Sequence, residues 1–419
     1  MVNKVRHTEL GDIPVDWKIQ TFEETFRMLS NNTLSRDNLN NRGGVVRNIH
    51  YGDILTVFPE VLNCRTEEIP YINNLNLLTA STQLLQDGDV VIADTAEDDT
   101  VGKVTEIQNL EENKLVAGLH TIPCRVKKGD FVPGWLGYYM NSHMYHNQIL
   151  PFITGTKVSS ISKSAIAGTL ILVPPIEIQR SIVAVLSKVD ELTRNERLTV
   201  DKLEAFKTAQ LQAMFPRNDA DIPEVRFPEF TDSWEQRKVK EFAIESEVKG
   251  HSGKDAKKLT VKLHNKGVYV ADEKIQGSDN TQYYIRRAGQ FIYGKQNFFN
   301  GAIGIVPKKL DKYESTKDVP AFDVSSDVNV DWLYYYIARP EIYKPQEALC
   351  TGTGSKRFHV NNFYNLSLAI PKMDEQIKIK EYFVHLDNLI TLHQHKCEKY
   401  VNIKKGMISE LLVGNIQIR

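Results

Sequence analysis

The chain has 419 residues, which at roughly 100–200 residues per domain predicts two to four domains and more than one buried core. Its 41% hydrophobic, 25% charged and 9% aromatic residues are typical of a globular protein and exclude a disordered, fibrous or membrane chain. With 52 basic and 53 acidic side chains the net charge is −1, which excludes a globally basic nucleic-acid binder and leaves local patches for any DNA contact.

The cysteines and the N-terminus indicate a cytoplasmic protein. Cys64, Cys124, Cys350 and Cys397 are far apart and form no C-x-x-C pair, so we expect reduced thiols. The first residues carry no apolar signal core, and no run approaches the ~18 apolar residues that a membrane span needs. We therefore expect a cytoplasmic location and no membrane partner.

Residues 1–175 contain short apolar runs, such as 90–93, that are broken by Gly, Asn and Asp turns. This pattern predicts a mixed α/β domain with short strands. Aromatic residues at 135–148 have the spacing of a helix core, which favours packing over base stacking. The loop at 154–163 combines hydroxyls, a glycine and two lysines, groups that suit phosphate and groove contact. Its candidate DNA-binding residues are Thr154, Thr156, Lys157, Ser159 and Lys163.

The segment 176–216 predicts a long helical spacer. Pro174 and Pro175 end the preceding strand-like run and suit the first turn of a helix. From Ile178 a seam then recurs at alternating spacings of four and three over five heptads, with Leu192 and Phe206 among its apolar members, a periodicity typical of coiled coils. The middle of this seam is polar, at Glu196 and Thr199.

Residues 217–371 predict a second mixed α/β domain, entered through a polar, proline-bearing linker. Two of its loops carry donors: amide side chains of the kind that read adenine, and an arginine that can bond bidentate to guanine. For any one residue, an ordinary Gly/Ser/Thr loop is an equally good interpretation. The candidate DNA-binding residues here are Lys295, Asn297, Thr351, Thr353, Ser355, Lys356 and Arg357.

Residues 372–419 predict a C-terminal helical spacer with a similar seam, which is polar at His393 and Lys396. If the two helices pack antiparallel, the polar middles of the two seams lie opposite each other, and Glu196 faces a residue of opposite charge. We expect such an antiparallel coiled coil; the alternative is two separate amphipathic helices, each on its own domain.

The two halves of the chain repeat each other at an offset of 197 residues, in a register that holds for about 75 residues. The match joins the two TGT loops and continues into the helices. Matched pairs include Trp135 with Trp332, Tyr138 with Tyr335, Gln179 with Gln376, Asp190 with Asp387 and Lys207 with Lys404. Upstream the match weakens, so each half has a variable N-terminal part and a shared C-terminal part. The two halves are therefore expected to form a pseudo-twofold repeat.

Motifs for catalysis are absent from the sequence. There is no G-x-x-x-x-G-K-[ST] for a nucleotide triphosphate, no H-E-x-x-H, no G-x-G-x-x-G after a strand, and no N/D-P-P-Y/F motif of aminomethyltransferases. The acidic cluster at 94–99 matches no metal-ligand spacing and favours a solvated turn. We therefore expect no catalytic residue, no metal and no cofactor in this chain.

The sequence resembles the specificity (S) subunit of type I restriction–modification systems over essentially its whole length. The resemblance rests on the duplication, on the helix starts P-P-I-E-I-Q at 174–179 and P-K-M-D-E-Q at 371–376, and on P-E-F-T-D-S-W-E at 228–235. Ile178 departs from the family pattern, in which Glu is common; neighbouring Glu177 can replace that acid.

The resemblance implies a fold of two α/β target-recognition domains joined by two long helices in an antiparallel coiled coil. Each domain would read one half of a split double-stranded DNA target, and the helices would dock two methyltransferase subunits. S-adenosylmethionine, ATP and Mg would act in partner subunits, namely the methyltransferase and restriction subunits. The alternatives are a DNA methyltransferase or nuclease with an unrecognised active site, and a scaffold that binds only proteins.

Overall fold

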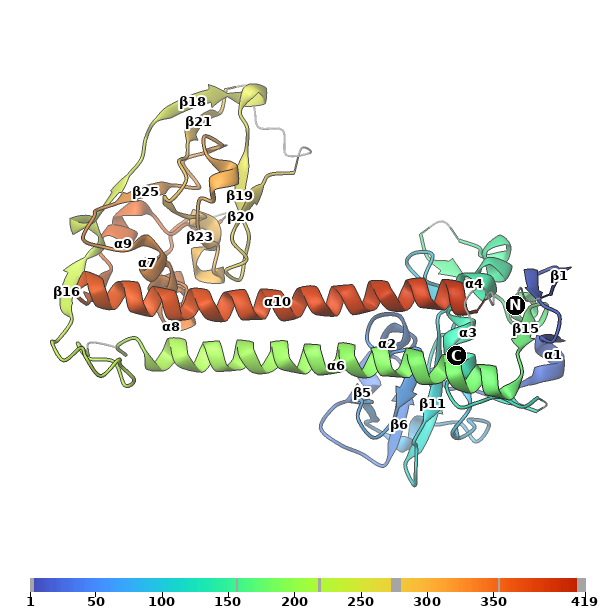
Figure 1. The fold of residues 1–419 in the computed structure, drawn as a ribbon. Coiled ribbons are helices and arrows are strands. Elements are labelled where there is room, and N and C mark those ends of the chain that lie inside the picture. Colours follow the sequence, from blue (N-terminus) through green and yellow to red (C-terminus); the bar gives the residue numbers. More distant parts are fainter. Residues whose placement is uncertain are drawn as a thin grey trace. The chain divides into compact units, whose positions relative to one another are not determined.

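The computed structural model describes residues 4–127, 129–155, 157–217, 220–272, 280–352 and 355–412. The chain forms two compact units (Figure 1). Unit 1 comprises residues 1–196 with 396–419, and unit 2 comprises residues 197–395. Each unit therefore combines a mixed α/β head with part of each of the two long helices, α6 (Ile176–Ala213) and α10 (Met373–Leu411).

The central sheet of unit 1 has the strand order β4-β13-β9-β11-β7, in which only the β11–β7 pair is parallel. All four residues of β9 are buried, which explains why this strand is a continuous apolar run. The strands are β4 (Phe26–Met28), β7 (Val61–Asn63), β9 (Val90–Ala93), β11 (Val104–Gln108) and β13 (Thr121–Val126).

A second sheet of unit 1, of order β12-β6-β8-β5, covers a smaller core. Its strands are β5 (Leu39–Asn40), β6 (Val46–Ile49), β8 (Tyr71–Ile72) and β12 (Lys114–Ala117). The remaining pairs of unit 1 are antiparallel: β1 (Val5–Thr8) with β2 (Gly11–Pro14), β3 (Lys18–Thr21) with β15 (Leu170–Val173), and β10 (Thr95–Ala96) with β14 (Ser159–Ser160).

The central sheet of unit 2 repeats four of these strands in the order β17-β25-β22-β23. In both sheets a fully buried strand pairs antiparallel with its neighbour from its first residue: Val90 of β9 lies opposite Cys124, and Phe291 of β22 lies opposite Phe322. The strands are β17 (Ala243–Glu245), β22 (Phe291–Tyr293), β23 (Ile303–Ile305) and β25 (Ala321–Val324). The pair β16 (Glu235–Lys238) with β26 (Ser367–Ile370) repeats the pair β3 with β15.

Unit 2 carries different additional strands from unit 1. A three-stranded sheet has the order β18-β21-β24, and β19 pairs with β20 as a hairpin. The bounds are β18 (Lys249–Ser252), β19 (Leu259–Val261), β20 (Val268–Val270), β21 (Gln282–Ile285) and β24 (Glu314–Ser315). The two units thus share a frame and differ in what is inserted into it.

Short helices complete each unit. The aromatic residues of the α3 segment are buried, with Trp135 fully enclosed, so the expectation that they pack in the core is confirmed. In the α7 segment Trp332, Tyr335 and Tyr336 are likewise buried, and Tyr334 is half-buried. In unit 1 the helices are α1 (Phe22–Thr25), α2 (Tyr51–Thr56), α3 (Trp135–Met140), α4 (His143–Ile149) and α5 (Lys163–Ala167). In unit 2 they are α7 (Val330–Ile337), α8 (Pro340–Tyr343) and α9 (Val360–Tyr364).

Within unit 1, α6 and α10 run antiparallel. Asp190 of α6 is bonded to Lys404 of α10, and six residues further along α6, Glu196 lies 3.7 Å from Lys396. The residue number rises on one helix as it falls on the other. The expectation that Glu196 meets an opposite charge is therefore confirmed.

The phase of the predicted seam is wrong at alternate positions. The predicted seam residues Leu192 and Phe206 are 36% and 46% exposed. The buried stripe of α6 in unit 1 consists of Gln179, Ile182, Leu186, Val189 and Thr193. The reason is that the stripe must face the head as well as α10, so it begins at the buried Gln179 and not at Ile178. Among the described helices, none is both long and apolar enough to cross a bilayer.

Candidate nucleic-acid interface

A cluster of Tyr, Asp and Lys joins the head of unit 1 to both long helices. The hydroxyl of Tyr138 on α3 donates to Asp190 Oδ2 on α6 at 2.6 Å. Lys404 Nζ on α10 donates to Asp190 Oδ1 at 2.6 Å and lies 5.1 Å from the centre of the Tyr138 ring. Burial and the Asp190 carboxylate raise the pKa of Tyr138, so its hydroxyl stays protonated and acts as a donor.

Unit 2 contains the same cluster. Its Tyr and Asp stand 197 positions after those of unit 1, and its Lys stands 197 positions before. Tyr335 on α7 donates to Asp387 Oδ2 on α10 at 2.6 Å, and Lys207 on α6 donates to Asp387 Oδ1. Lys207 Nζ lies 5.4 Å from the centre of the Tyr335 ring. A charged, hydrogen-bonded cluster thus fixes the position of each head along its two long helices.

A buried glutamine fixes the approach to α3 in unit 1. The amide of Gln179 donates to the carbonyls of Pro174 at 2.9 Å and Asp130 at 3.1 Å, and accepts from the Val132 N–H at 3.0 Å. Only an amide side chain can donate and accept in this way at once. Gln376 repeats these bonds with Pro371, Asp327 and Asn329. The glutamines were matched in the sequence repeat, but their role in holding the heads was not predicted.

The first predicted loop forms a tight turn in unit 1. Thr154 and Ser160 exchange two backbone hydrogen bonds, and Gly155 adopts a φ of +110°. A Cβ at Gly155 would lie 1.9 Å from the Val158 carbonyl oxygen, so the turn requires glycine. The predicted Lys157 and Lys163 are exposed and Ser159 is half-buried in β14; Thr156 lies outside the described residues.

The second predicted loop forms the equivalent turn in unit 2. Thr351 and Arg357 exchange two backbone bonds, as Thr154 and Ser160 do at the same offset. Gly352 has a φ of +133°, and a Cβ there would lie 2.4 Å from the Ser355 carbonyl oxygen. Ser355 is exposed, whereas Thr353 lies outside the described residues. The repeated TGT sequence therefore encodes a turn of the shared frame.

The predicted cations of this turn are paired with carboxylates. Lys356 Nζ lies 2.9 Å from Glu347 Oε1, and Arg357 Nε lies 3.2 Å from Asp318 Oδ1. Lys295 is half-buried, and burial lowers its pKa. Its carbonyl accepts from the Phe358 N–H at 2.8 Å, so the Lys295 segment lies beside the turn.

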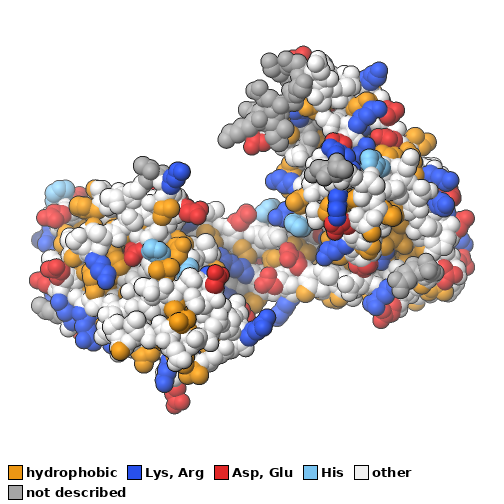
Figure 2. Space-filling model, turned by 180° about the vertical axis from the view of Figure 1, so that it is seen from behind, with side chains coloured by type: hydrophobic (Ala, Val, Ile, Leu, Met, Phe, Trp, Pro, Cys, Tyr) orange, Lys and Arg blue, Asp and Glu red, His pale blue; other side chains and the backbone are white. Residues whose placement is uncertain are grey.

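Asn297 lies in the same 3-10 segment as Lys295 (Lys295–Asn300). Its Oδ1 accepts from the Asn300 side chain at 3.1 Å. The structure therefore brings the predicted residues of unit 2 together, and it compensates the charge of two of them. On the face of the molecule drawn in Figure 2, basic and acidic side chains are interspersed over both units.

Residues that sequence analysis missed lie in the β19–β20 hairpin, where the exposed Lys262 and Lys266 form no ion pair with a described residue. The signal that could have found them is the absence of any acidic residue from 256 to 271, a stretch that contains four lysines. The two TGT turns belong to the part of the chain that repeats without a gap, whereas this hairpin lies upstream of it.

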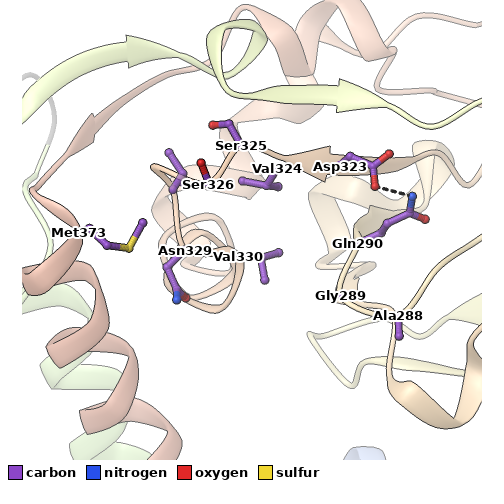
Figure 3. A pocket seen from close by; sticks show the side chains of 11 residues that line it. Ala288, Gly289, Gln290, Asp323, Val324, Ser325, Ser326, Asn329, Val330 and Met373 are labelled. Atoms are coloured by element: carbon purple, nitrogen blue, oxygen red, sulfur yellow. Dashed lines mark hydrogen bonds between the residues drawn. The ribbon is translucent and has the colours of Figure 1, made fainter.

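A pocket of about 420 Å³ in unit 2 lies between the β22–β25 pair and the start of α10 (Figure 3). Gln290 donates to Asp323 across its wall at 2.8 Å, and Met373 lines the helix side. No lysine or arginine lines this pocket, and its charged group is a carboxylate. It is therefore unsuited to DNA phosphates. Among the described residues, no group of three or more His, Cys, Asp or Glu side chains could hold a metal ion.

Comparisons with known proteins give a consistent result. A family model described as "Type I restriction modification DNA specificity domain" matches residues 14–205. The chain is 21% identical over 428 residues to the putative type I restriction enzyme MjaX specificity subunit of Methanocaldococcus jannaschii, an alignment that covers 99% of this chain and 97% of that protein.

Solved structures share the fold. One, from work on complex assembly and conformational transition of the type I R-M system, has a TM-score of 0.57 at 14% identity and covers 96% of this chain and 99% of its own. The type I restriction–modification S subunit from M. genitalium has a TM-score of 0.51 at 13% identity, covering 98% of this chain and 99% of its own. The expected architecture, with two mixed α/β domains and two long helices packed against each other, is confirmed.

Proposed function

Because this chain belongs to the family of type I restriction–modification DNA specificity (S) subunits, we propose that each of its two units reads one half of a split DNA target. The chain is the DNA specificity subunit of such a system. The S subunit family is non-catalytic, and catalysis lies in the methyltransferase and restriction subunits.

The observation that carries the two-half proposal is the duplicated Tyr–Asp–Lys cluster. It holds two heads on their helices by the same contacts, Tyr138 with Asp190 in one unit and Tyr335 with Asp387 in the other. The heads have a common central sheet and different inserted strands. Equal placement with different inserts suits two modules that face DNA in the same manner and read different sequences.

The repeated turns at 154–160 and 351–357 are proposed to contact the DNA backbone. Their shape is common to both units, so a contact made by the turn backbone would position each head without encoding sequence. In unit 2, Lys356 and Arg357 would exchange Glu347 and Asp318 for phosphate oxygens on binding. Arg357 retains the planar fork that suits phosphate or guanine.

Two methyltransferase subunits are proposed to dock on the long helices, one on each unit. Several exposed apolar side chains lie along the two long helices, and a face of this kind suits contact with a protein partner. On unit 1 these include Leu192 and Ile403; on unit 2 they include Leu198, Phe206 and Leu392. S-adenosylmethionine would be used by the methyltransferase subunits, and ATP and Mg²⁺ by the restriction subunits.

The experiment that tests the function is co-expression with the cognate methyltransferase subunit, followed by mapping of N6-methyladenine by modified-base sequencing. We expect a split motif to be methylated only when both proteins are present. Methylation by this chain alone would establish an active site in it, and an unmethylated genome in cells that contain a stable, methylation-competent complex would contradict the proposal.

A double substitution, Lys356→Ala with Arg357→Ala, tests the turn of unit 2. We expect recognition of one half-site to be lost while assembly with the methyltransferase subunits is retained, because both side chains lie at the surface of the head. The matched control is Glu347→Gln with Asp318→Asn, which frees both cations and should keep recognition. Unchanged methylation specificity in the alanine variant would contradict the assignment of these two residues.

A further inference from the structure

We propose that the β19–β20 hairpin and the neighbouring 3-10 turn Lys308–Leu310 form the main phosphate-contacting surface of unit 2. We call it the hairpin surface, and its residues are Lys262, Lys266, Tyr269, Lys308, Lys309 and Lys312. The inference rests on the proposed function of unit 2 in DNA reading and names the surface that supplies its electrostatic attraction.

The positive charge of the hairpin surface is not compensated within the described chain. Its lysines lie in no ion pair with a described residue, whereas Lys356 and Arg357 of the predicted turn are both paired with carboxylates. The one acid between 307 and 312, Asp311, accepts from the Ala288 N–H at 2.9 Å. Unpaired surface lysines attract phosphate at no cost of breaking an existing ion pair.

An exposed aromatic ring organises two of these lysines. The ring of Tyr269 is 40% exposed, and Lys262 Nζ lies 4.1 Å from its centre. Lys309 Nζ, from the neighbouring 3-10 turn, lies 6.0 Å from the same centre. Cation–π contact holds both ammonium groups near the same ring without neutralising their charge. The surface therefore presents ammonium donors together with an apolar plate that can lie against sugar or base edges.

The hairpin is held firmly against the frame of unit 2. Val268 packs with Val306 and Leu310 in one small core, which joins the hairpin to the 3-10 turn. A Cβ at Gly304 would lie 2.8 Å from Val268 Cγ2, so glycine permits the close approach of hairpin and β23. The lysines consequently project from a defined surface, which limits the entropy lost when they bind.

The tip of the hairpin lies beside the predicted residues of unit 2. His264 and Asn265 both have positive φ, and their N–H groups donate to the carbonyls of Asn300 at 2.9 Å and Gly301 at 2.8 Å. These carbonyls end the segment that contains Lys295 and Asn297. The hairpin surface thus extends the site predicted from sequence, and among the described strands the pair β19–β20 is not part of the sheet that the two units share.

Duplex DNA is favoured over an acidic protein as the partner of this surface. Lysine is depleted in protein–protein interfaces, whereas lysine and arginine supply the phosphate contacts of DNA-binding proteins. The exposed side chains that accompany the lysines, Leu263 and Val270, lie on the same hairpin and suit contact with thymine methyl groups.

The test substitutes the two lysines at the Tyr269 ring, Lys262→Gln with Lys309→Gln, in the full chain assembled with its methyltransferase subunits. The probes are a labelled duplex that carries the mapped split site and a duplex of equal length with a scrambled sequence. We expect the slope of log K against log salt concentration to fall by about 2 on both probes, since each phosphate contact contributes about 0.9.

Matched controls separate the possible outcomes. Lys240→Gln with Lys344→Gln removes the same charge from exposed positions of the same unit and should leave the slope unchanged. Lys262→Arg with Lys309→Arg keeps the charge and should retain the slope, while Tyr269→Leu should weaken binding with little change of slope. An unaltered slope in the glutamine variant overturns the inference.

Loss of methyltransferase binding with unaltered DNA binding also overturns it, since the surface would then bind protein. If the wild-type complex itself shows no preference for the split site over the scrambled duplex, the proposed function fails first. The two failures are therefore distinguishable in one set of titrations.

Discussion

Lys404 and Lys207 occupy equivalent positions in the two clusters but bind different numbers of carboxylates. Lys404 Nζ donates at 2.6 Å to both Asp190 and Glu60, whereas Lys207 is bonded to Asp387. Burial would raise the pKa of Glu60, but the charge and hydrogen bond of Lys404 lower it below its usual value. Glu60 is therefore ionised, and its stabilising contribution is present above about pH 4.5 and is lost as the pH falls through the lowered pKa.

Substitution of the two lysines by methionine tests this asymmetry. We expect Lys404→Met to lower the free energy of unfolding of unit 1 by about 3 kcal/mol, because it leaves two carboxylates uncompensated in a buried site. Lys207→Met should cost unit 2 about 1 kcal/mol, since its partner is more exposed. Hydrogen exchange resolves the two units. Adding Glu60→Gln should restore part of the loss in Lys404→Met only; equal losses for both lysines would contradict the argument.

His251 makes the β18–β21–β24 sheet sensitive to pH. Its Nδ1 lies 2.6 Å from Oε1 of the buried Glu314, and the hydrogen bond and charge of that carboxylate raise the pKa of His251 above 6.5. Stability from this pair is fully present below pH 6.5 and is lost as the pH rises through the raised pKa. The difference in thermal midpoint between wild type and His251→Gln should therefore be larger at pH 6 than at pH 9. A difference that grows with pH would refute this assignment.

At the scale of elements, each long helix has one face against its head and partner helix and another that stays uncovered. Phe206 of α6 and Ile403 of α10 stand 197 positions apart and are 46% and 41% exposed. The exposed part of each side chain is not covered by the described chain, and both residues belong to the face on which we propose that partner subunits dock.

Single substitutions of these residues should change the stoichiometry of the complex. We expect Phe206→Ser and Ile403→Ser each to reduce the number of bound methyltransferase subunits from two to one, and the double variant to bind none, as counted by native mass spectrometry. The matched controls are Lys202→Ser and Lys399→Ser, at an equal offset on the same helices. Retention of two subunits by the double variant would show that docking uses another face.

At the scale of the whole molecule, each unit contains its own core and its own Tyr–Asp–Lys cluster. Damage to one cluster should therefore affect one half of the proposed DNA target. We expect methylation mapping with Lys207→Met to show a degenerate motif in the half read by unit 2 and an unchanged other half. Degeneracy in both halves would mean that the clusters act on the molecule as a unit.

Much of the architecture could be predicted from sequence because it depends on local patterns. The heptad spacing after Pro174 and Pro371 specifies two long helices, since an apolar stripe on a helix must be buried. The repeated TGT turns are equally local, because their glycines adopt φ values that other residues disfavour. The duplication itself is visible as matched residues at one offset.

The charged part of the candidate site could not be predicted in this way, because charge compensation depends on residues that meet only in the folded chain. Arg357 pairs with Asp318, 39 residues earlier, and Lys404 with Glu60, 344 residues earlier. The phase of the buried stripe on α6 also depends on residues distant in sequence, because contacts with the head, and not with α6 itself, bury Gln179. The sequence alone therefore determined two recognition modules on two helices; only the tertiary structure decided which lysines remain available for DNA, because proximity in space sets which charges are neutralised.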